Sequence, residues 1–248
     1  MYQFFVEPYQ INGTDIVING SDFNHIKNVL RMRVGEELSV VTEGEDKEYR
    51  CEIAAFEDEQ VLCRLQFIKE ENVELPNQIY LFQGLPKSDK LELIIQKAVE
   101  LGAFQIIPVQ MKRTVVKLDA KKEASKLTRW NAIAEAAAKQ AKRRIVPEVK
   151  PVMSMKEAIA YCEDFEVKLV PYELSDKAGM QKTREIISKI EPKQRVAVFI
   201  GPEGGFDESE IKLAVETGIV PITLGRRILR TETAGFTVLS WLVYQLEQ

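Results

Sequence analysis

The residues best suited to chemistry in this 248-residue chain lie in three loops, and each loop follows an apolar segment. The loops are residues 84–90 (GLPKSDK), 201–206 (GPEGGF) and 224–233 (LGRRILRTET). In open α/β sheets, ligands bind beyond the carboxyl ends of the strands. If the apolar segments are parallel strands of one sheet, the three loops form one ligand site.

The loop at 201–206 has three glycines in five positions, at Gly201, Gly204 and Gly205. It matches neither the dinucleotide motif GxGxxG nor the Walker A motif, which argues against a dinucleotide fold or a nucleotide triphosphatase. Glycines let a ligand approach the backbone closely, so the free amides could hold an adenine edge, a ribose or a carboxylate. The alternative is a plain turn into a helix beginning at Asp207, which needs fewer glycines.

The loop at 224–233 carries Arg226, Arg227 and Arg230, with Glu232 two residues further on. Guanidinium groups suit planar or bidentate acceptors such as a phosphate or a base edge. The alternative is a basic surface turn neutralised by Glu232. The position of this loop after an apolar strand favours a functional role.

Histidine and cysteine chemistry is nearly excluded, since His25 is the single histidine and none of the three cysteines forms a CxxC pair. The two-histidine zinc motifs are absent. We therefore expect no metal site, and reduced thiols in a cytoplasmic protein. Residues 1–10 lack the basic start of a signal peptide. The uncharged stretch at 233–246 is too short to cross a membrane, so we interpret it as a buried helix.

Two kinds of element must position these loops. Residues 1–71 alternate apolar and polar side chains, as at 49–53 and 61–67, which is typical of half-buried strands. One helix beginning at Ser21 or Asp22 interrupts them. The residues predict a small antiparallel β-barrel over 1–71, followed by a charged linker at 69–76 that ends at Pro76.

After Pro76, strands and helices alternate over residues 72–248. We predict strands at 78–84, 104–109, 167–172, 195–201 and 219–224, with helices between them and a last helix from Thr231. Asp89 with Glu92, and Asp207 with Glu210, have the spacing of helix capping boxes. This alternation is typical of an α/β domain with a parallel sheet and helices on both faces.

Charge is uneven along the chain, whose net formal charge is −4. Residues 1–71 contain seven Lys or Arg and fifteen Asp or Glu, whereas residues 112–144 contain eleven basic and three acidic residues. Such a basic block is either a phosphate-binding surface or a solvated helix face.

Four segments together resemble a known family. They are HIKNVLRMRVGEEL (25–38), GLPKSDKLELIIQKAVELGAFQIIPVQMKRTVVKLD (84–119), VFIGPEGGFDESEI (198–211) and LGRRILRTETA (224–234). They closely resemble the bacterial 16S rRNA uracil-N3 methyltransferase family, which belongs to the SPOUT superfamily of S-adenosylmethionine-dependent RNA methyltransferases. The likeness covers nearly the whole chain.

The resemblance implies a PUA-like RNA-binding β-barrel over 1–71 and a methyltransferase domain with a C-terminal deep trefoil knot over 72–248. It implies a homodimer that takes 16S rRNA within the 30S subunit and needs neither a membrane nor a metal. The cofactor S-adenosylmethionine would contact Gly201, Pro202, Glu203, Gly204, Gly205, Leu224, Gly225, Ile228, Leu229 and Thr233. Arg230 and Glu232 would be catalytic. RNA would contact Arg31, Lys87, Lys90, Arg113, Arg129, Gln140 and Arg143.

Three positions depart from the family pattern. Gln3 replaces an arginine that commonly precedes an aromatic pair, and Ala136 and Lys139 replace two acidic residues. These changes lie outside the loops assigned to the cofactor. Two other functions stay open: a SPOUT enzyme acting on another RNA, for example at a ribose 2′-OH, and a non-catalytic RNA-binding protein.

Overall fold

A computed structural model describes residues 1–70, 73–172 and 179–247. The chain forms two compact units. The first consists of Met1–Glu74 and Ala138–Val146, and the second of Leu75–Ala137 and Pro147–Gln248. The predicted boundary between residues 71 and 72 lies outside the described residues. That residues 138–146 belong to the first unit is not apparent from the sequence.

The first unit is a six-stranded sheet in the order β1-β4-β5-β6-β3-β2. The strands are β1 (Gln3–Phe5), β2 (Ile11–Asn12), β3 (Asp15–Ile18), β4 (Glu37–Val41), β5 (Lys47–Glu57) and β6 (Gln60–Glu70). The predicted alternation is confirmed, because Cys51, Ile53, Val61 and Cys63 all point into one core. β1 pairs with β4 in parallel, whereas the other neighbours are antiparallel. A long crossover separates β1 from β4, which permits the parallel pairing.

The predicted short helix of the first unit is divided into two pieces. α1 (Gly20–Asn24) continues into a π-helical turn, η2 (His25–Val29). Ile26 packs into the core with no exposed surface. After this turn Arg31 is exposed and takes a left-handed conformation with φ of 57°.

Arg143 and Arg144 are interior residues of the first unit. Arg144 lies 3.5 Å from Glu48, and both side chains are almost completely buried. Arg143 Nε donates to Glu74 at 3.0 Å, and Gln3 Nε2 donates to the Arg143 carbonyl at 2.8 Å. We expected Arg143 to contact RNA phosphates, but the ion pair with Glu74 and an exposure of only 5% leave its guanidinium no open face.

The second unit is built on a seven-stranded sheet in which all pairs are parallel, as predicted. The order is β10-β8-β7-β12-β11-β13, and β9 also pairs with β8. The strands are β7 (Gln78–Gly84), β8 (Gln105–Gln110), β9 (Glu148–Val149), β10 (Met153–Ser154), β11 (Val167–Pro171), β12 (Arg195–Ile200) and β13 (Val220–Ile222).

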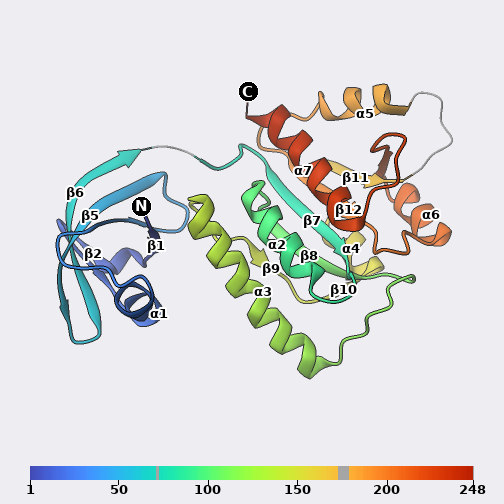
Figure 1. The fold of residues 1–248 in the computed structure, drawn as a ribbon. Coiled ribbons are helices and arrows are strands. Elements are labelled where there is room, and N and C mark those ends of the chain that lie inside the picture. The colour runs from blue at the N-terminus through green and yellow to red at the C-terminus, as the bar shows by residue number, and fades with distance from the viewer. Residues whose placement is uncertain (71–72, 173–178, 248) are drawn as a thin grey trace. The chain divides into compact units, whose positions relative to one another are not determined.

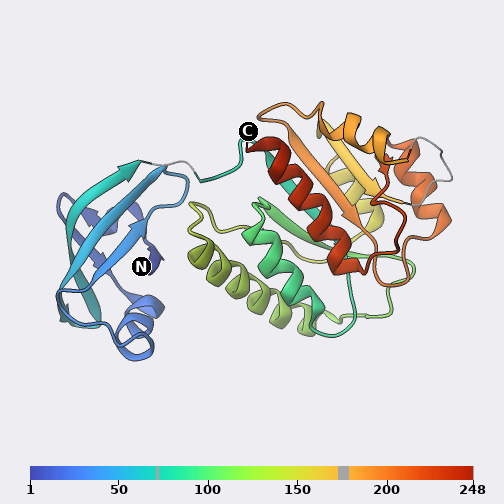
Figure 2. The same ribbon diagram turned by 45° about the horizontal axis from the view of Figure 1, so that its top comes forward.

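Helices cover both faces of this sheet, which Figures 1 and 2 show from two directions. α2 (Lys90–Glu100) and α7 (Thr231–Leu246) lie side by side on one face. α4 (Met155–Tyr161) and α6 (Glu208–Glu216) pack on the other, against Tyr80 and Phe82 of β7. The remaining helices are α3 (Ala120–Ala141) and α5 (Gly179–Ile187). β7 is buried on both faces, as expected for a central parallel strand.

The two predicted capping boxes have different outcomes. Asp207 accepts from the Ser209 amide, and Glu210 closes the reciprocal bond, so the box that begins α6 is confirmed. The box at Asp89 is wrong, because the Asp89 side chain makes no cap hydrogen bond. Glu92 instead accepts from Arg129 Nη2 of α3 at 2.7 Å. α4 was not predicted, and α3 begins at Ala120, well before the predicted start near Arg129.

Candidate functional site

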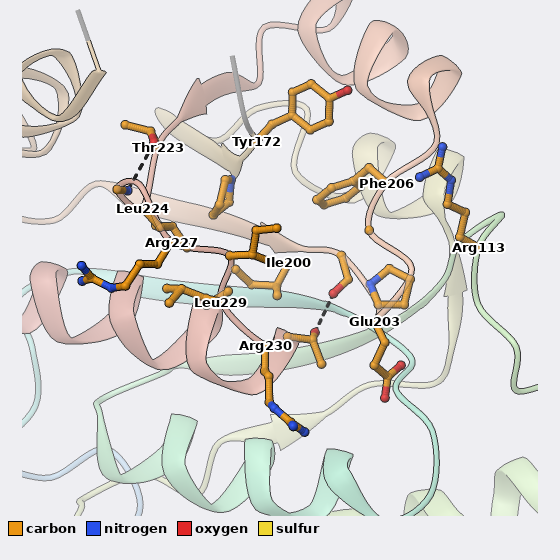
Figure 3. Close-up of a pocket in the computed structure, with 18 of the residues that line it drawn as sticks. Arg113, Tyr172, Ile200, Glu203, Phe206, Thr223, Leu224, Arg227, Leu229 and Arg230 are labelled. Carbon is orange, nitrogen blue, oxygen red and sulfur yellow. Dashed lines mark hydrogen bonds between the residues drawn. The ribbon is translucent and has the colours of Figure 1, made fainter. Parts of the chain in front are cut away.

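A cavity of about 730 Å³ lies beyond the carboxyl ends of β11, β12 and β13 in the second unit. The loops at 201–206 and 224–233 form its walls (Figure 3). Lys90, at the start of α2, also lines it. The size of the cavity is typical of small-molecule and cofactor sites. Its lining consists of Lys90, Arg113, Pro171, Tyr172, Ile200, Gly201, Pro202, Glu203, Gly205, Phe206, Glu208, Thr223, Leu224, Gly225, Arg227, Ile228, Leu229, Arg230, Thr231 and Ala234.

The geometry of the loop at 201–206 requires glycine at two places, one within the loop because of its backbone conformation and one at the end of β7 because of close packing. Gly205 has a φ of +67° and donates its amide to the Pro202 carbonyl at 2.8 Å, which closes a tight turn. At the end of β7, a Cβ on Gly84 would lie 2.6 Å from the Pro202 nitrogen. The chain can therefore bring the ends of β7 and β12 together only because Gly84 has no side chain.

The loop at 224–233 is anchored by paired threonines. The Thr223 amide donates to Thr183 Oγ1 at 3.0 Å, and the Thr183 hydroxyl donates to the Thr223 carbonyl at 3.3 Å. Gly225 then donates its amide to Thr223 Oγ1 at 3.3 Å. These bonds fix the segment that leads from β13 into the cavity.

Lys90 lies between two carboxylates at the edge of the cavity. Its ammonium is 3.4 Å from Glu203 and 3.6 Å from Glu232. Burial alone would raise the pKa of Glu203, but hydrogen bonds from the Glu203 and Lys87 amides and from Lys90 hold that pKa below its ordinary value. Glu203 therefore stays ionised at neutral pH. Glu232 does not line the cavity, and its Oε2 is buried without a hydrogen-bond partner in the described chain.

Arg230 presents an exposed guanidinium at the cavity wall, directly before α7 begins. In Figure 3 its side chain extends away from the Tyr172 and Phe206 rings. Across residues 1–70, 73–172 and 179–247, no carboxylate pairs with this guanidinium. Arg230 is thus a cation available for an anionic or polarised ligand.

Two basic residues after β8 contact the loop at 201–206, which we call the glycine loop, and the start of α6 that follows it. Arg113 Nη1 donates to the Gly204 carbonyl at 3.2 Å, and Lys112 lies 3.3 Å from Asp207. Hydrogen bonds from the Ser209 hydroxyl and amide, and then from Lys112, lower the pKa of Asp207 to about 2. The start of α6 is therefore fixed by a permanently charged cap.

The predicted cofactor residues gather at the cavity, except Gly204 and Thr233, which do not line it. Gly204 is packed against the Arg113 side chain instead. Of the residues predicted to bind RNA, Lys90 and Arg113 line the cavity, and Lys87 is exposed. Arg129 pairs with Glu92, while Arg31 and Gln140 are exposed residues of the first unit.

Phe206, Arg227 and Thr231 line the cavity and lie in the two loops that were predicted to form it. Six lining residues were not predicted from the sequence: Pro171, Tyr172, Ile200, Glu208, Thr223 and Ala234. Tyr172 and Thr223 were identifiable, since both lie at the carboxyl ends of predicted strands, where ligands bind. No signal in the sequence distinguishes Ala234 from other helix residues.

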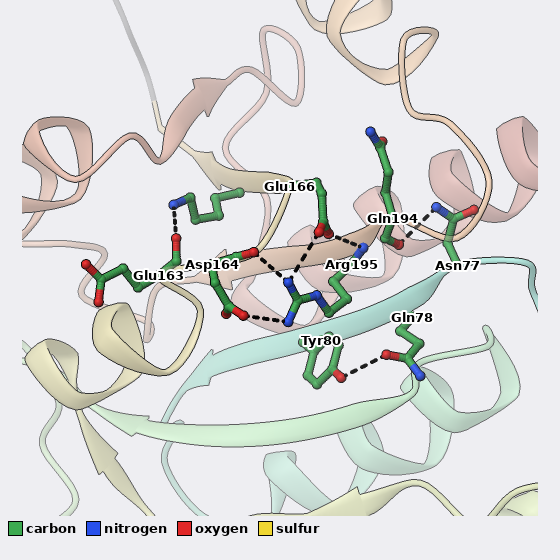
Figure 4. A network of polar contacts seen from close by, with 9 residues as sticks. Asn77, Gln78, Tyr80, Glu163, Asp164, Glu166, Gln194 and Arg195 are labelled. Atoms are coloured by element: carbon green, nitrogen blue, oxygen red, sulfur yellow. Dashed lines mark hydrogen bonds and ion pairs between the residues drawn. The ribbon is translucent and has the colours of Figure 1, made fainter.

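A second polar cluster lies at the amino-terminal edge of the same sheet (Figure 4). Arg195 pairs with Asp164 at 2.9 Å and with Glu166 at 3.2 Å, and its guanidinium lies over the Phe165 ring. Hydrogen bonds from the Arg195 amide and guanidinium lower the pKa of Glu166 to about 2. Asn77 Nδ2 donates to the Glu191 carbonyl at 2.7 Å. The cluster joins the starts of β11 and β12 and has no part in the cavity.

The described residues contain no group of three side chains that could hold a metal ion. A search of the same residues finds no helix with the length and apolarity needed to cross a membrane.

The comparisons with known proteins concern both units. A family model for an RNA methyltransferase domain matches residues 73–243, which include every residue of the cavity. The chain belongs to this RNA methyltransferase family. A second model, for the PUA domain of RNA methyltransferases, matches residues 18–66 of the first unit.

Individual relatives cover the whole chain. Ribosomal RNA small subunit methyltransferase E of Bacillus subtilis is 41% identical over 100% of this chain and 98% of its own. A methyltransferase from Legionella pneumophila, solved with bound SAM, is 32% identical with a TM-score of 0.85, over 97% and 96% of the two chains. The Neisseria gonorrhoeae ribosomal RNA small subunit methyltransferase E, solved with S-adenosyl methionine, is 29% identical with a TM-score of 0.82 over the same shares.

Proposed function

We propose that this protein is an S-adenosylmethionine-dependent methyltransferase that methylates N3 of a specific uridine near the 3′ end of 16S rRNA. The proposal rests on one observation: in a member of an RNA methyltransferase family, the glycine loop and the loop at 224–233 form the walls of a cavity. The names of the relatives support the small-subunit rRNA as substrate, and the bound molecules of two solved relatives support the cofactor.

The residues present fit S-adenosylmethionine. The cavity of about 730 Å³ combines apolar walls at Ile200 and Leu229 with backbone groups of the glycine loop and the carboxylates of Glu203 and Glu208. This donor set suits a nucleoside that also carries positive charge. Bound there, the cofactor supplies a methyl group activated by its sulfonium centre. The residues that would hold it are those of the predicted set that line the cavity: Gly201, Pro202, Glu203, Gly205, Leu224, Gly225, Ile228 and Leu229.

Arg230 is the proposed catalytic cation. Uracil N3 carries a proton that must leave for N3 to attack. As it leaves, negative charge spreads onto O2 and O4 of the base, and this charge is neutralised when N3 takes the methyl group. A preorganised guanidinium stabilises such developing charge, and Arg230 has no carboxylate partner in the described chain that would compete. Glu232 is the second candidate. Its carboxylate pairs with Lys90 rather than with Arg230, which disfavours a role in orienting Arg230. Glu232 does not line the cavity, so to accept the N3 proton it would have to reach the base past Lys90.

The proposed RNA surface of the second unit comprises Lys87, Lys90, Arg113 and Arg129. Lys87 and Arg113 are exposed, and Arg113 and Lys90 lie on the cavity rim, where a flipped base must enter. In the first unit, Arg31 and Gln140 remain candidates, because their side chains are exposed. Phosphate contacts by these cations would make RNA binding sensitive to salt.

The resemblance also suggests a trefoil knot and a homodimer, which we include in the proposal. The knot is proposed on the resemblance; the structure shows that Thr231, after the loop at 224–230, bonds back to Gly201 and that α7 packs on β12. Support for a second copy comes from exposed apolar side chains on this part of the unit: Leu93 is 45% exposed and Tyr244 is 78% exposed. A substrate within the 30S subunit would place the reaction in the cytoplasm.

The test is methyl transfer from labelled S-adenosylmethionine into 16S rRNA, with intact 30S subunits compared with naked RNA. Nucleoside mass spectrometry should find 3-methyluridine. A ribose 2′-O-methyl product would instead establish the alternative SPOUT activity. If calorimetry detects no cofactor binding, the protein is a non-catalytic RNA-binding protein.

A further inference from the structure

A chain of hydrogen bonds connects three segments at the wall of the cavity. Gln83, at the end of β7, has no exposed surface, and its Nε2 donates to Thr231 Oγ1 at 2.8 Å and to the Gly84 carbonyl at 3.0 Å. The Thr231 hydroxyl in turn donates to the Gly201 carbonyl at 2.6 Å. We call Gln83, Thr231 and Gly201 the relay.

The direction of the relay is fixed by proton count. A threonine hydroxyl has one proton, and Thr231 gives it to Gly201, so Thr231 Oγ1 can only accept from Gln83. If the Gln83 amide were reversed, its oxygen would face the Gly84 carbonyl and both of its hydrogen bonds would be lost. The observed orientation leaves Oε1 buried without a partner in the described chain, which is costly for a polar atom.

That cost indicates a role beyond packing. The four residues of β7 before Gln83 are buried and three of them are apolar, so an apolar residue at position 83 would complete the strand without an unsatisfied oxygen. What glutamine provides is a bond to Thr231, which is the first residue of α7 and directly follows Arg230. Gly201, at the other end of the relay, begins the glycine loop.

We propose that Gln83 and Thr231 are positioning residues for methyl transfer. They hold the start of α7, and with it Arg230, in a fixed place relative to the glycine loop. The inference rests on the proposed function. It adds that alignment of the reacting groups depends on two side chains, neither of which belongs to the predicted cofactor, catalytic or RNA-binding sets.

Thr231→Val and Thr231→Ser are the matched variants. Valine keeps the shape and loses the hydroxyl, whereas serine keeps the hydroxyl. At saturating cofactor, Thr231→Val should lower the single-turnover rate about 100-fold, which is the loss that a misplacement of about 1 Å can cause. Its cofactor Kd should rise by a much smaller factor, because Thr231 and Gly201 line the cavity but many other residues also line it. Thr231→Ser should recover most of the rate.

Gln83→Met tests the other end of the relay. It too should lower the single-turnover rate far more than it weakens cofactor binding. Asn77→Ser is the control, because it removes buried hydrogen bonds at the opposite edge of the sheet and should leave the rate unchanged. A wild-type rate in Thr231→Val, equal impairment of Thr231→Ser, or a defect that disappears at saturating cofactor would each overturn the proposal.

A separate measurement keeps the relay testable if the proposed function fails. If wild-type protein transfers no methyl group to 16S rRNA, only the proposed function is refuted. Amide hydrogen exchange in the start of α7 should still be faster in Thr231→Val than in Thr231→Ser. Equal exchange in the two folded variants would refute the relay itself.

Discussion

Replacing Gly84 by alanine would place a methyl group against the backbone of the glycine loop. The added Cβ would lie 2.6 Å from the Pro202 nitrogen, 2.7 Å from Pro202 Cδ and 3.0 Å from the Gly201 carbonyl carbon, whereas ordinary contact begins at 3.4 Å. These neighbours are backbone or ring atoms, so they cannot rotate away. Relief requires the loop to move by several tenths of an ångström, and the cavity wall moves with it.

Overpacking of this kind costs about 1–3 kcal/mol. For a chain of this size, that corresponds to a fall in melting temperature of roughly 2–12 °C. Because Gly201 and Pro202 line the cavity, the Kd for S-adenosylmethionine should rise as well. Thermal denaturation and calorimetry measure the two effects.

Gly235→Ala is the matched control. Its Cβ would meet Gln83 Oε1 at 3.7 Å, which is ordinary contact, and alanine is favoured over glycine within a helix by about 1 kcal/mol. This variant should be as stable as the wild type or more so. If Gly84→Ala keeps the wild-type melting temperature and cofactor Kd, the close packing of β7 on the glycine loop does not shape the site.

Three further results are expected. Arg230→Ala should abolish methyl transfer while calorimetry still detects the cofactor; near-normal turnover would remove Arg230 from the mechanism. The pKa of Glu166 is lowered to about 2, so its pairing with Arg195 stabilises the fold above the ordinary pKa and is lost as pH falls toward 2. Arg195→Met should therefore lower the urea midpoint at pH 6 and have less effect near pH 2. Arg144→Met should cost about 3 kcal/mol, since it breaks a buried ion pair with Glu48; unchanged urea denaturation would contradict that.

Local patterns predicted the elements that depend on local interactions. β7 has the predicted bounds, because a run of apolar residues ending in glycine is sufficient to define it. The boxes at Asp89 and Asp207 have the same spacing but different outcomes. The Glu210 carboxylate accepts from the Asp207 amide at the start of its own helix, whereas the Glu92 carboxylate accepts from Arg129, 37 positions later in the chain. Spacing alone cannot reveal a competing partner that distant.

The parts of the candidate site that follow predicted strands could be identified from the sequence, whereas its long-range side-chain contacts could not. The loops at 201–206 and 224–233 meet because both follow strands of one parallel sheet. The pairing of Gln83 with Thr231 joins residues 148 positions apart, and it depends on a strand order that alternation does not determine. Arg143 and Arg144 were counted in the basic block at 112–144. In the structure both are buried, because they pair with Glu74 and Glu48, which lie far away in the sequence.

The first unit is discontinuous in sequence, since it needs residues 138–146 as well as 1–74. During synthesis, its six strands leave the ribosome long before Arg143 and Arg144 do. Until then Gln3, Glu48 and Glu74 lack Arg143 and Arg144, with which they pair in the finished fold. The amino-terminal unit therefore reaches its final structure only after more than half of the polypeptide has been translated.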